Sequence, residues 1–238
     1  MTAQPKLQAS ARLGSGAMFD AIAPRYDLLN RLISLGIDQS WRRKTVASLQ
    51  LSPGDRALDL ATGTADLAIL VARRTGASVV GLDPSTGMMK VGEEKIQRLG
   101  LSEQVKLVEG DAQELPFGDG GFAGICMAFG IRNVPDRSRA LREMARVTRS
   151  GGRIAILELS EPRAGWLGAA ARFHMHRVVP WLGGLLSGSR EYRYLPESIQ
   201  RFPSPEAFCS LMSEAGLRDV RALPLTFGVC QLFTAEVP

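Results

Sequence analysis

An apolar run that ends in a tight turn of small residues occupies positions 57–66, with the sequence ALDLATGTAD. A helical pattern begins directly after the turn. This order is typical of a nucleotide site in a parallel sheet, because the turn lets a ligand approach the backbone beside a helix N-terminus. A second apolar run ends in Asp83, twenty residues after Gly63, where a carboxylate can accept hydrogen bonds from both hydroxyls of a ribose. The two strands predict a site for an adenosine-type ligand; a strand, turn and helix without a ligand is the alternative.

The residues of the turn indicate which ligand it suits. A dinucleotide fingerprint needs three glycines so that the backbone can reach a pyrophosphate, but here Ala61 and Ala65 flank the single glycine, Gly63. Asp59 would repel a pyrophosphate and attract the ammonium group of an amino acid. The turn resembles the first motif of class I S-adenosylmethionine-dependent methyltransferases, whose first and third positions are usually glycine. The resemblance implies S-adenosylmethionine as the cofactor.

Composition bounds the class of protein. A chain of 238 residues, 45% of them apolar, can bury a sizeable core. The net charge of +5 is mild and the basic residues form no dense cluster, which argues against a nucleic-acid partner and leaves a weak attraction to anionic lipid open. Three scattered cysteines (Cys126, Cys209 and Cys230) favour reduced thiols and no metal site. Without a signal segment or a long apolar run, a cytoplasmic location is expected.

Strand and helix patterns alternate along the central part of the chain, which predicts an α/β fold with a parallel sheet. Thr64 is the expected N-cap of the first crossover helix, and Ser85 precedes the second. Two further apolar segments, 220–225 and 227–236, predict a closing hairpin. The expected architecture is a doubly wound, mostly parallel seven-stranded sheet with an antiparallel C-terminal strand. The five expected parallel strands are 57–60, 78–82, 105–108, 124–128 and 153–159.

The ends of the chain and one long insertion complete the expected organisation. Residues 1–16 are polar and small and are expected to be disordered, and residues 17–238 to form one domain. Within it, apolar residues at three- and four-residue spacing predict a helical lid over residues 17–50. Residues 160–203 are expected to form an inserted, substrate-facing segment, whose apolar part could equally be a core helix pair. Residues 189–198 are rich in aromatic and charged side chains, as binding loops often are.

Two further strand ends carry polar residues. Asp111 follows the third strand, where it could accept a hydrogen bond from an adenine amino group or simply form a turn. Arg132 follows the fourth strand, and a guanidinium buried without a partner is costly. Arg132 is therefore expected to have a function.

Three segments, 18–30, 129–134 and 192–199, resemble the signatures of the ubiquinone/menaquinone biosynthesis C-methyltransferases. The resemblance extends from about residue 18 to residue 226. That family methylates a ring carbon of a prenylated quinol with S-adenosylmethionine, and its menaquinone branch converts demethylmenaquinol to menaquinol. The resemblance implies this reaction for the chain, with the benzoquinol precursor of ubiquinone, or another small or lipid substrate, as alternatives. The cofactor contacts expected from the turn and the resemblance are Asp59, Gly63, Thr64, Asp83, Asp111, Ala112 and Ala128, the last at a position where many members have serine.

The catalytic residues expected from the same reasoning are Arg132, Asn133, Tyr26 and Asp27. Arg132 would stabilise the quinol oxyanion, Asn133 would orient the quinol or a water molecule, and Tyr26 and Asp27 would position the substrate. The expected partners are the prenylated quinol and, peripherally, the inner face of the cell membrane, with a homo-oligomer left open. Two rivals are a nicotinamide oxidoreductase, disfavoured by the missing glycines, and a catalytically silent S-adenosylmethionine-binding protein, disfavoured by the Arg132–Asn133 pair.

Overall fold

The computed structural model describes residues 19–20, 23, 26–28, 30–31, 34–161 and 191–238. The side chains of residues 191–194 lie outside this description, as do the expected disordered tail, 1–16, and the apolar part of the expected insertion, 166–188.

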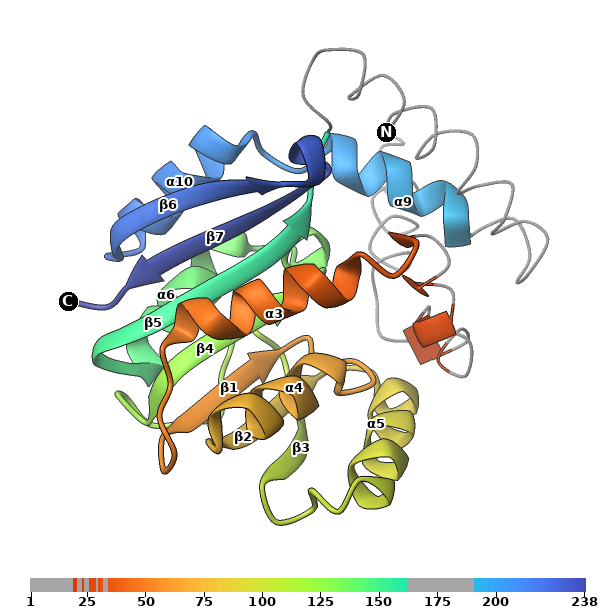
Figure 1. Ribbon diagram of the computed structural model, residues 1–238. Coiled ribbons are helices and arrows are strands. Elements are labelled where there is room, and N and C mark those ends of the chain that lie inside the picture. The colour runs from red at the N-terminus through yellow and green to blue at the C-terminus, as the bar shows by residue number, and fades with distance from the viewer. Residues whose placement is uncertain (1–18, 21–22, 24–25, 29, 32–33, 162–190) are drawn as a thin grey trace, which may run out of the picture.

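Seven strands form one sheet in the order β3-β2-β1-β4-β5-β7-β6 (Figure 1). Strands β1 to β5 are parallel to one another, whereas β7 runs antiparallel to both β5 and β6. The expected doubly wound sheet is thus confirmed. Successive strands step outward in opposite directions from β1 and β4, and this reversal is where open α/β sheets bind ligands. The strands are β1 (Arg56–Leu60), β2 (Ser78–Asp83), β3 (Val105–Glu109), β4 (Phe122–Ala128), β5 (Thr148–Leu159), β6 (Arg218–Leu225) and β7 (Cys230–Glu236).

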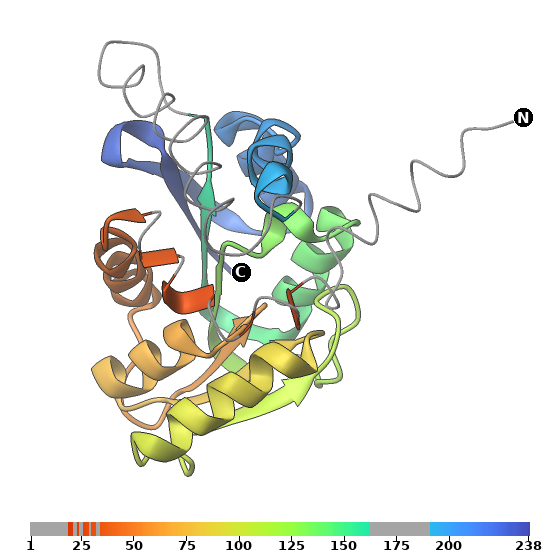
Figure 2. The ribbon, with the colours of Figure 1, turned by 90° about the vertical axis from the view of Figure 1, so that its right-hand side faces the viewer.

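Helices cover both faces of the sheet. Helices α3, α4 and α5 pack on one face and α6 and α10 on the other, and Figure 2 shows the two helical layers on opposite sides of the strands. Apolar runs without alternation are expected of such strands, because both of their faces are buried. The described helices are α3 (Asp38–Leu49), α4 (Asp66–Thr75), α5 (Thr86–Arg98), η1 (Ile131–Asn133), α6 (Arg137–Val147), α9 (Glu191–Gln200), α10 (Pro205–Glu214) and η3 (Thr226–Gly228).

The first two crossover helices begin differently. The Ser85 hydroxyl accepts a hydrogen bond from the backbone N–H of Met88, so Ser85 is the N-cap of α5. The N-cap of α4 is Ala65, without a side-chain cap bond, so the prediction for Thr64 is wrong. The Thr64 hydroxyl donates instead to a carboxylate oxygen of Asp27 at 2.6 Å, and a charged acceptor makes the stronger bond.

The described part of the N-terminal segment and helix α9, which are far apart in the sequence, both approach the carboxyl ends of the parallel strands. The described residues between 19 and 31 are helical and lie on the side of the sheet that faces the viewer in Figure 2. The binding loop expected at 189–198 is wrong in its described part, because residues 191–198 belong to helix α9, which contains Pro196. Ile199 at the end of α9 is buried, so packing against the domain overrides the cost of a proline inside a helix.

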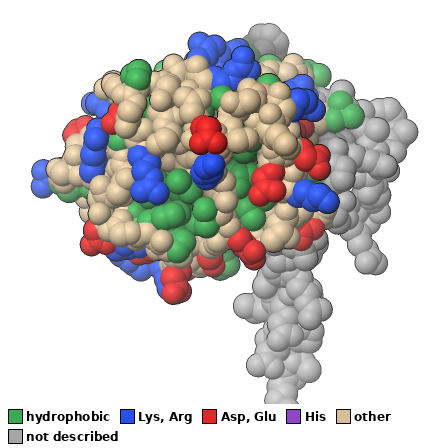
Figure 3. Space-filling model, turned by 90° about the horizontal axis from the view of Figure 1, so that it is seen from below, with side chains coloured by type: hydrophobic (Ala, Val, Ile, Leu, Met, Phe, Trp, Pro, Cys, Tyr) green, Lys and Arg blue, Asp and Glu red, His purple; other side chains and the backbone are tan. Residues whose placement is uncertain are grey.

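The surface carries mixed charges. Acidic and basic side chains alternate around a group of hydrophobic ones on the face seen in Figure 3. This face therefore has no continuous basic stripe of the kind that nucleic acid requires. Among the described residues, no helix has both the length and the apolar character needed to cross a bilayer.

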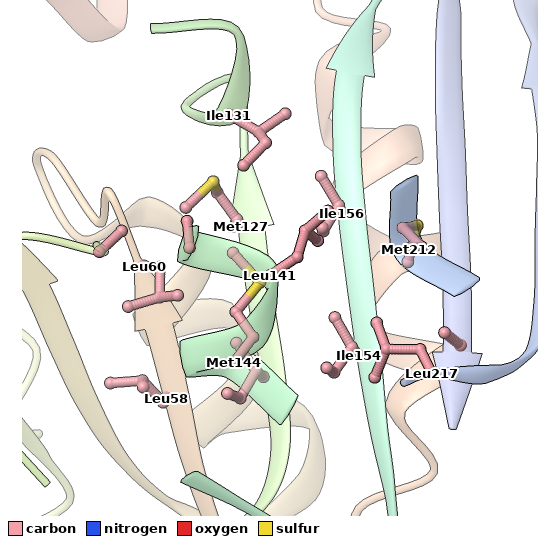
Figure 4. Packing of buried hydrophobic residues seen from close by; sticks show 14 of the residues in the cluster. Leu58, Leu60, Met127, Ile131, Leu141, Met144, Ile154, Ile156, Met212 and Leu217 are labelled. Atoms are coloured by element: carbon pink, nitrogen blue, oxygen red, sulfur yellow. The ribbon is translucent and has the colours of Figure 1, made fainter. Parts of the chain in front are cut away.

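Alternate residues of the central strands enter two separate cores. Leu58 and Leu60 of β1 and Ile154 and Ile156 of β5 point to the side of α6 and α10, where Met144 packs between them (Figure 4). The residues between them face α3, α4 and α5. A strand residue's position therefore decides which helical layer its side chain meets.

Candidate active site

A cavity of about 700 Å³ opens at the carboxyl ends of the four strands β1 to β4. The topological reversal between β1 and β4 lies at its centre, so its position follows from the strand order. The described residues that line it are Phe19, Tyr26, Ala61, Gly63, Leu82, Asp83, Pro84, Met88, Asp111, Ala112, Gln113, Met127, Ala128, Phe129, Gly130, Arg132, Asn133, Val134, Pro135, Arg137, Ser198 and Arg201.

The turn after β1 has the backbone of a glycine-rich loop, although two of its three positive-φ residues are alanines. Ala61, Gly63 and Ala65 all have positive φ angles, of 50°, 55° and 64°. Such angles cost an alanine roughly 1–2 kcal/mol, so the fold imposes this turn on two residues that disfavour it. Strain of this kind is typical of functional turns.

Asp83 fixes the turn from the end of β2. One carboxylate oxygen accepts the backbone N–H of Gly63 at 2.8 Å, and the other accepts that of Ser85 at 2.8 Å. Burial raises the pKa of Asp83, the two backbone bonds lower it, and the negative charge of Asp20 raises it further. The carboxylate is thus held rigidly on the cavity wall with lone pairs left for a ligand's hydroxyl groups.

Asp111 and Ala112 lie on the wall after β3. The Asp111 carboxylate accepts hydrogen bonds from the backbone N–H and the side-chain amide of Gln113 at 2.8–3.0 Å. The amide oxygen of Gln113 accepts the backbone N–H of Asp136, the N-cap of α6. Gln113 therefore links the expected adenine-binding carboxylate to the next helix, a role that the sequence alone did not indicate.

Arg132 stands on the opposite wall, after β4. Its guanidinium Nη1 donates to Glu158 Oε1 at 2.6 Å and to the carbonyl oxygen of Phe129 at 2.7 Å. Glu158 Oε2 also accepts the backbone N–H of Arg132 at 3.1 Å. The side chain of Glu158 is 0% exposed and that of Arg132 is 8% exposed. The sequence singled out Arg132 but gave no indication of Glu158 as its partner.

Three other expected residues line the same cavity: Tyr26, Ala128 and Asn133. The Tyr26 ring packs edge-on against Phe19 with ring centroids 6.2 Å apart. Ala128 ends β4 immediately before Phe129, whose φ angle is also positive, at 62°. The wall at this end of β4 is therefore mainly apolar, as an aromatic ring would require.

Two of the expected residues lie behind the wall in one network with a lysine. Asp27 accepts the Thr64 hydroxyl with one oxygen and the Lys95 ammonium with the other, at 2.6 and 2.8 Å. Lys95 also pairs with Asp66. In this arrangement Asp27 and Thr64 join the N-terminal segment to α4 and α5, and neither side chain lines the cavity.

Asp59 also lies behind the wall, between β1 and α3. It is 1% exposed and accepts the Thr62 hydroxyl at 2.7 Å and the Cys126 thiol at 3.5 Å. Burial raises the pKa of Asp59 to about 6, although these bonds and the positive charge of Arg42 lower it. Asp59 was expected beside the ammonium group of a ligand. It instead supports the turn after β1 from beneath, through its bond with Thr62.

Asp20 is a further residue that the sequence did not single out. Its carboxylate oxygen Oδ1 accepts the Ser85 hydroxyl at 2.6 Å and the backbone N–H of Gly87 at 2.8 Å. An acidic residue beside an apolar helical face was an available signal, but no local pattern indicates what Asp20 would contact. Asp20 holds the N-terminal segment against the first turn of α5.

Sequence comparison places relatives across nearly the whole chain. A model of the "ubiE/COQ5 methyltransferase family" matches residues 8–236. A Thermus thermophilus protein named demethylmenaquinone methyltransferase is 47% identical over 224 residues, which cover 93% of this chain and 100% of that protein. A Geobacter sulfurreducens protein named ubiquinone/menaquinone biosynthesis C-methyltransferase UbiE is 45% identical over 221 residues, covering 92% and 86%.

Solved structures share the fold at lower identity. A SAM-dependent methyltransferase from Aquifex aeolicus aligns with a TM-score of 0.61 at 20% identity, over 83% of this chain and 89% of that one. The [4+2]-cyclase SpnF aligns with a TM-score of 0.68 at 20% identity, over 96% and 97%. Because a cyclase has the same architecture, the fold alone does not fix the reaction. The family match and the two close relatives do fix the lineage: the chain belongs to the ubiE/COQ5 methyltransferase family.

Proposed function

We propose that this protein transfers a methyl group from S-adenosylmethionine to a ring carbon of a prenylated quinol, converting demethylmenaquinol to menaquinol. The observation that carries the proposal is that Arg132, after β4, and Asp83, at the end of β2, line one cavity from either side of β1. A fixed carboxylate suits the hydroxyls of a nucleoside, and a fixed guanidinium suits the oxygen of an acidic ring hydroxyl. Relatives with 47% and 43% identity are named for this reaction.

The residues present fit the adenosyl cofactor. Asp83 has both oxygens anchored by backbone N–H groups, so it can accept ribose hydroxyl bonds without moving. Asp111 can accept the adenine amino group and the Ala112 backbone follows it on the same wall. At Gly63 an added Cβ would lie 3.1 Å from the Met88 methyl group, so the turn has little room for a side chain. When bound, S-adenosylmethionine supplies an electrophilic methyl group on a sulfonium.

Arg132 would act on the other substrate. A quinol ring carbon becomes nucleophilic as its hydroxyl loses a proton, and a preorganised donor lowers the free energy of the resulting oxyanion. The arginine stays charged and is a poor base, so a water molecule or a carboxylate takes the proton. Asn133, adjacent on the cavity wall, would hold the quinol or that water. Tyr26 would close the ring site from the N-terminal segment.

A methylation assay tests the proposal. Purified protein is incubated with S-adenosylmethionine and, side by side, demethylmenaquinol and the demethylated benzoquinol precursor of ubiquinone, with products identified by mass spectrometry. We expect the naphthoquinol to react faster. Arg132→Ala should lower turnover by roughly 100-fold or more while the dissociation constant of S-adenosylhomocysteine stays within about twofold. Absence of methylation on both quinols by the wild-type protein would refute the proposed function.

Delivery of a prenylated substrate suggests contact with a membrane surface. Exposed apolar side chains in the described part include Leu35 at 73% and Phe227 at 59%, and the chain has a net positive charge of +5. Apolar insertion plus attraction to anionic lipid is the usual basis of peripheral binding. In a flotation assay with anionic vesicles we expect part of the protein to float; complete retention in the soluble fraction would exclude this route.

A further inference from the structure

We infer that Glu158 is the positioning residue for Arg132: it holds the guanidinium in its place on the cavity wall and compensates its charge before the substrate oxyanion forms. This inference rests on the proposed function, in which Arg132 contacts the substrate. It adds a residue from β5, a strand that contributes no described residue to the cavity wall itself.

The position of Glu158 follows from the alternation along β5. Ile154 and Ile156 point into the core beneath α6, so the next residue on the same face, Glu158, points to the same side at the carboxyl end of the strand. There it is 0% exposed. A carboxylate at the end of an apolar row is costly unless charged and polar groups satisfy it.

The donors to Glu158 come mainly from one residue. Oε1 accepts Arg132 Nη1 at 2.6 Å and Oε2 accepts the Arg132 backbone N–H at 3.1 Å. The backbone N–H of Leu159 is also bound by Oε1, at 2.9 Å. Glu158 therefore fixes both ends of Arg132, the main chain in η1 and the guanidinium tip.

At the guanidinium end, both N–H groups of Arg132 Nη1 donate to protein acceptors. One donates to Glu158 Oε1 and the other to the carbonyl oxygen of Phe129. Two bonds to one nitrogen fix the plane of the guanidinium, because its five donors form a rigid fork. An oxyanion binder gains from such fixation, since no reorganisation is needed when the charge develops.

Charge compensation gives the second part of the role. A lone guanidinium on an apolar wall would resist the entry of an uncharged naphthoquinol ring, because covering it costs desolvation energy. With Glu158 at 2.6 Å the pair is neutral overall. Removal of the negative charge would leave Arg132 uncompensated and would favour ionisation of a bound quinol hydroxyl at lower pH.

Glu158→Gln tests both parts. An amide offers one acceptor where the carboxylate offers two, so one of the two tethers to Arg132 is lost. We expect kcat to fall roughly 10- to 100-fold, the range for partners that orient a reacting group, with the dissociation constant of S-adenosylhomocysteine unchanged within about twofold. The rising limb of the kcat–pH profile should move to lower pH. Glu158→Asp, which keeps the charge but shortens the side chain, should lower kcat without moving that limb.

A matched control is Glu143→Gln. Glu143 also accepts from an arginine, Arg146, at 2.7 and 2.8 Å and from a backbone N–H, that of Leu115, at 2.8 Å. It does not line the cavity. The same substitution there should leave kcat and the pH profile as in the wild type. If Glu143→Gln loses activity as Glu158→Gln does, the loss reflects general destabilisation of the fold, and the inference is overturned.

Two further measurements separate this inference from the proposed function. Rotation of the Arg132 guanidinium, followed by NMR of ¹⁵N-labelled arginine, should be hindered in the wild type and faster in Glu158→Gln; this readout needs no substrate. In the Arg132→Met background, Glu158→Gln should cost no further kcat. Wild-type rotation rates in Glu158→Gln, or additive losses in the double variant, would overturn the role of Glu158. A wild-type protein with hindered rotation but no quinol methylation would instead refute the proposed function alone.

Discussion

Single residues in this protein show how the same side chain serves different purposes at neighbouring strand ends. Asp83 reaches the cavity wall with both oxygens bound by backbone N–H groups. Asp59, at the adjacent strand end, lies beneath the turn with weaker donors. Burial dominates for Asp59 and raises its pKa to about 6. The contribution of Asp59 to the free energy of unfolding should therefore depend on pH, and this dependence can be measured.

Replacement of Asp59 by asparagine should change that pH dependence in a defined direction. The pKa of Asp59 is about 6 in the folded state against a usual 3.8, so the folded state holds the proton more tightly. The contribution of Asp59 to stability is then fully present below about pH 4 and is lost as the pH rises through 6. Asp59→Asn removes this loss, so the variant should gain roughly 1–3 kcal/mol over the wild type at pH 7.5 and little at pH 4.

Urea unfolding at both pH values measures the effect. Asp119→Asn is a suitable control, because Asp119 is an exposed partner of Arg146 and should leave the pH dependence as in the wild type. A gain for Asp59→Asn that is equal at pH 4 and pH 7.5 would contradict the assignment of the titration to Asp59.

At the scale of elements, two turns meet at the reversal of strand order. The turn after β1 carries Ala61, and the turn after β4 carries Gly130. A Cβ added to Gly130 would lie 2.5 Å from the Cβ of Ala61 and 3.2 Å from Cγ of Met127. The close contact shows that the two sides of the cavity floor are packed against each other without room for another methyl group.

Gly130→Ala should therefore be destabilising by about 1–3 kcal/mol, the cost of overpacking. The φ angle of Gly130 is −106°, so backbone strain does not contribute. In the double variant Ala61→Gly/Gly130→Ala the methyl groups no longer collide, and most of the loss should be recovered. Urea midpoints for the four proteins of this cycle give the coupling energy. Gly118→Ala, with no atom within 4 Å of an added Cβ, serves as the neutral control; additive losses in the cycle would exclude a direct contact.

The N-terminal segment is a second element whose attachment can be tested. Asp20 binds Ser85 and Gly87 at the start of α5, whereas Asp27 binds Thr64 and Lys95. Asp20→Asn should speed hydrogen exchange of the Gly87 amide, because an asparagine is a weaker acceptor than a carboxylate. Asp27→Asn should speed exchange in the N-terminal segment without affecting Gly87. Peptide-resolved exchange by mass spectrometry distinguishes the two, and equal protection of Gly87 in wild type and Asp20→Asn would contradict the contact.

Across the whole molecule, the architecture was readable from the sequence and the contacts behind the cavity were not. Strands followed by Asp83 and Asp111 predicted which sheet edge would hold the site, because carboxyl ends of parallel strands share one edge. The partner of Arg132 could not be predicted, since Glu158 is 26 residues away and no local pattern joins them. Local rules favour Thr64 as a helix cap. Its hydroxyl instead donates to the carboxylate of Asp27, which is far from it in the sequence.

Ligand binding is linked to the stability of the whole molecule. A ligand that binds only the folded state at 100 times its dissociation constant adds about 2.7 kcal/mol to the free energy of unfolding. For a chain of this size that raises Tm by roughly 5–10 °C. S-adenosylhomocysteine, which cannot donate a methyl group, should produce this shift in the wild type, and NAD⁺ should produce none. In Asp83→Asn the side-chain NH2 group would face one of the two backbone N–H donors that the carboxylate now accepts, so the ligand site is weakened. At the same ligand concentration, the rise in Tm should therefore fall to about 1–2 °C. A comparable shift with NAD⁺ would instead favour a nicotinamide oxidoreductase, because the cavity would then accept a pyrophosphate beside the turn that contains Gly63.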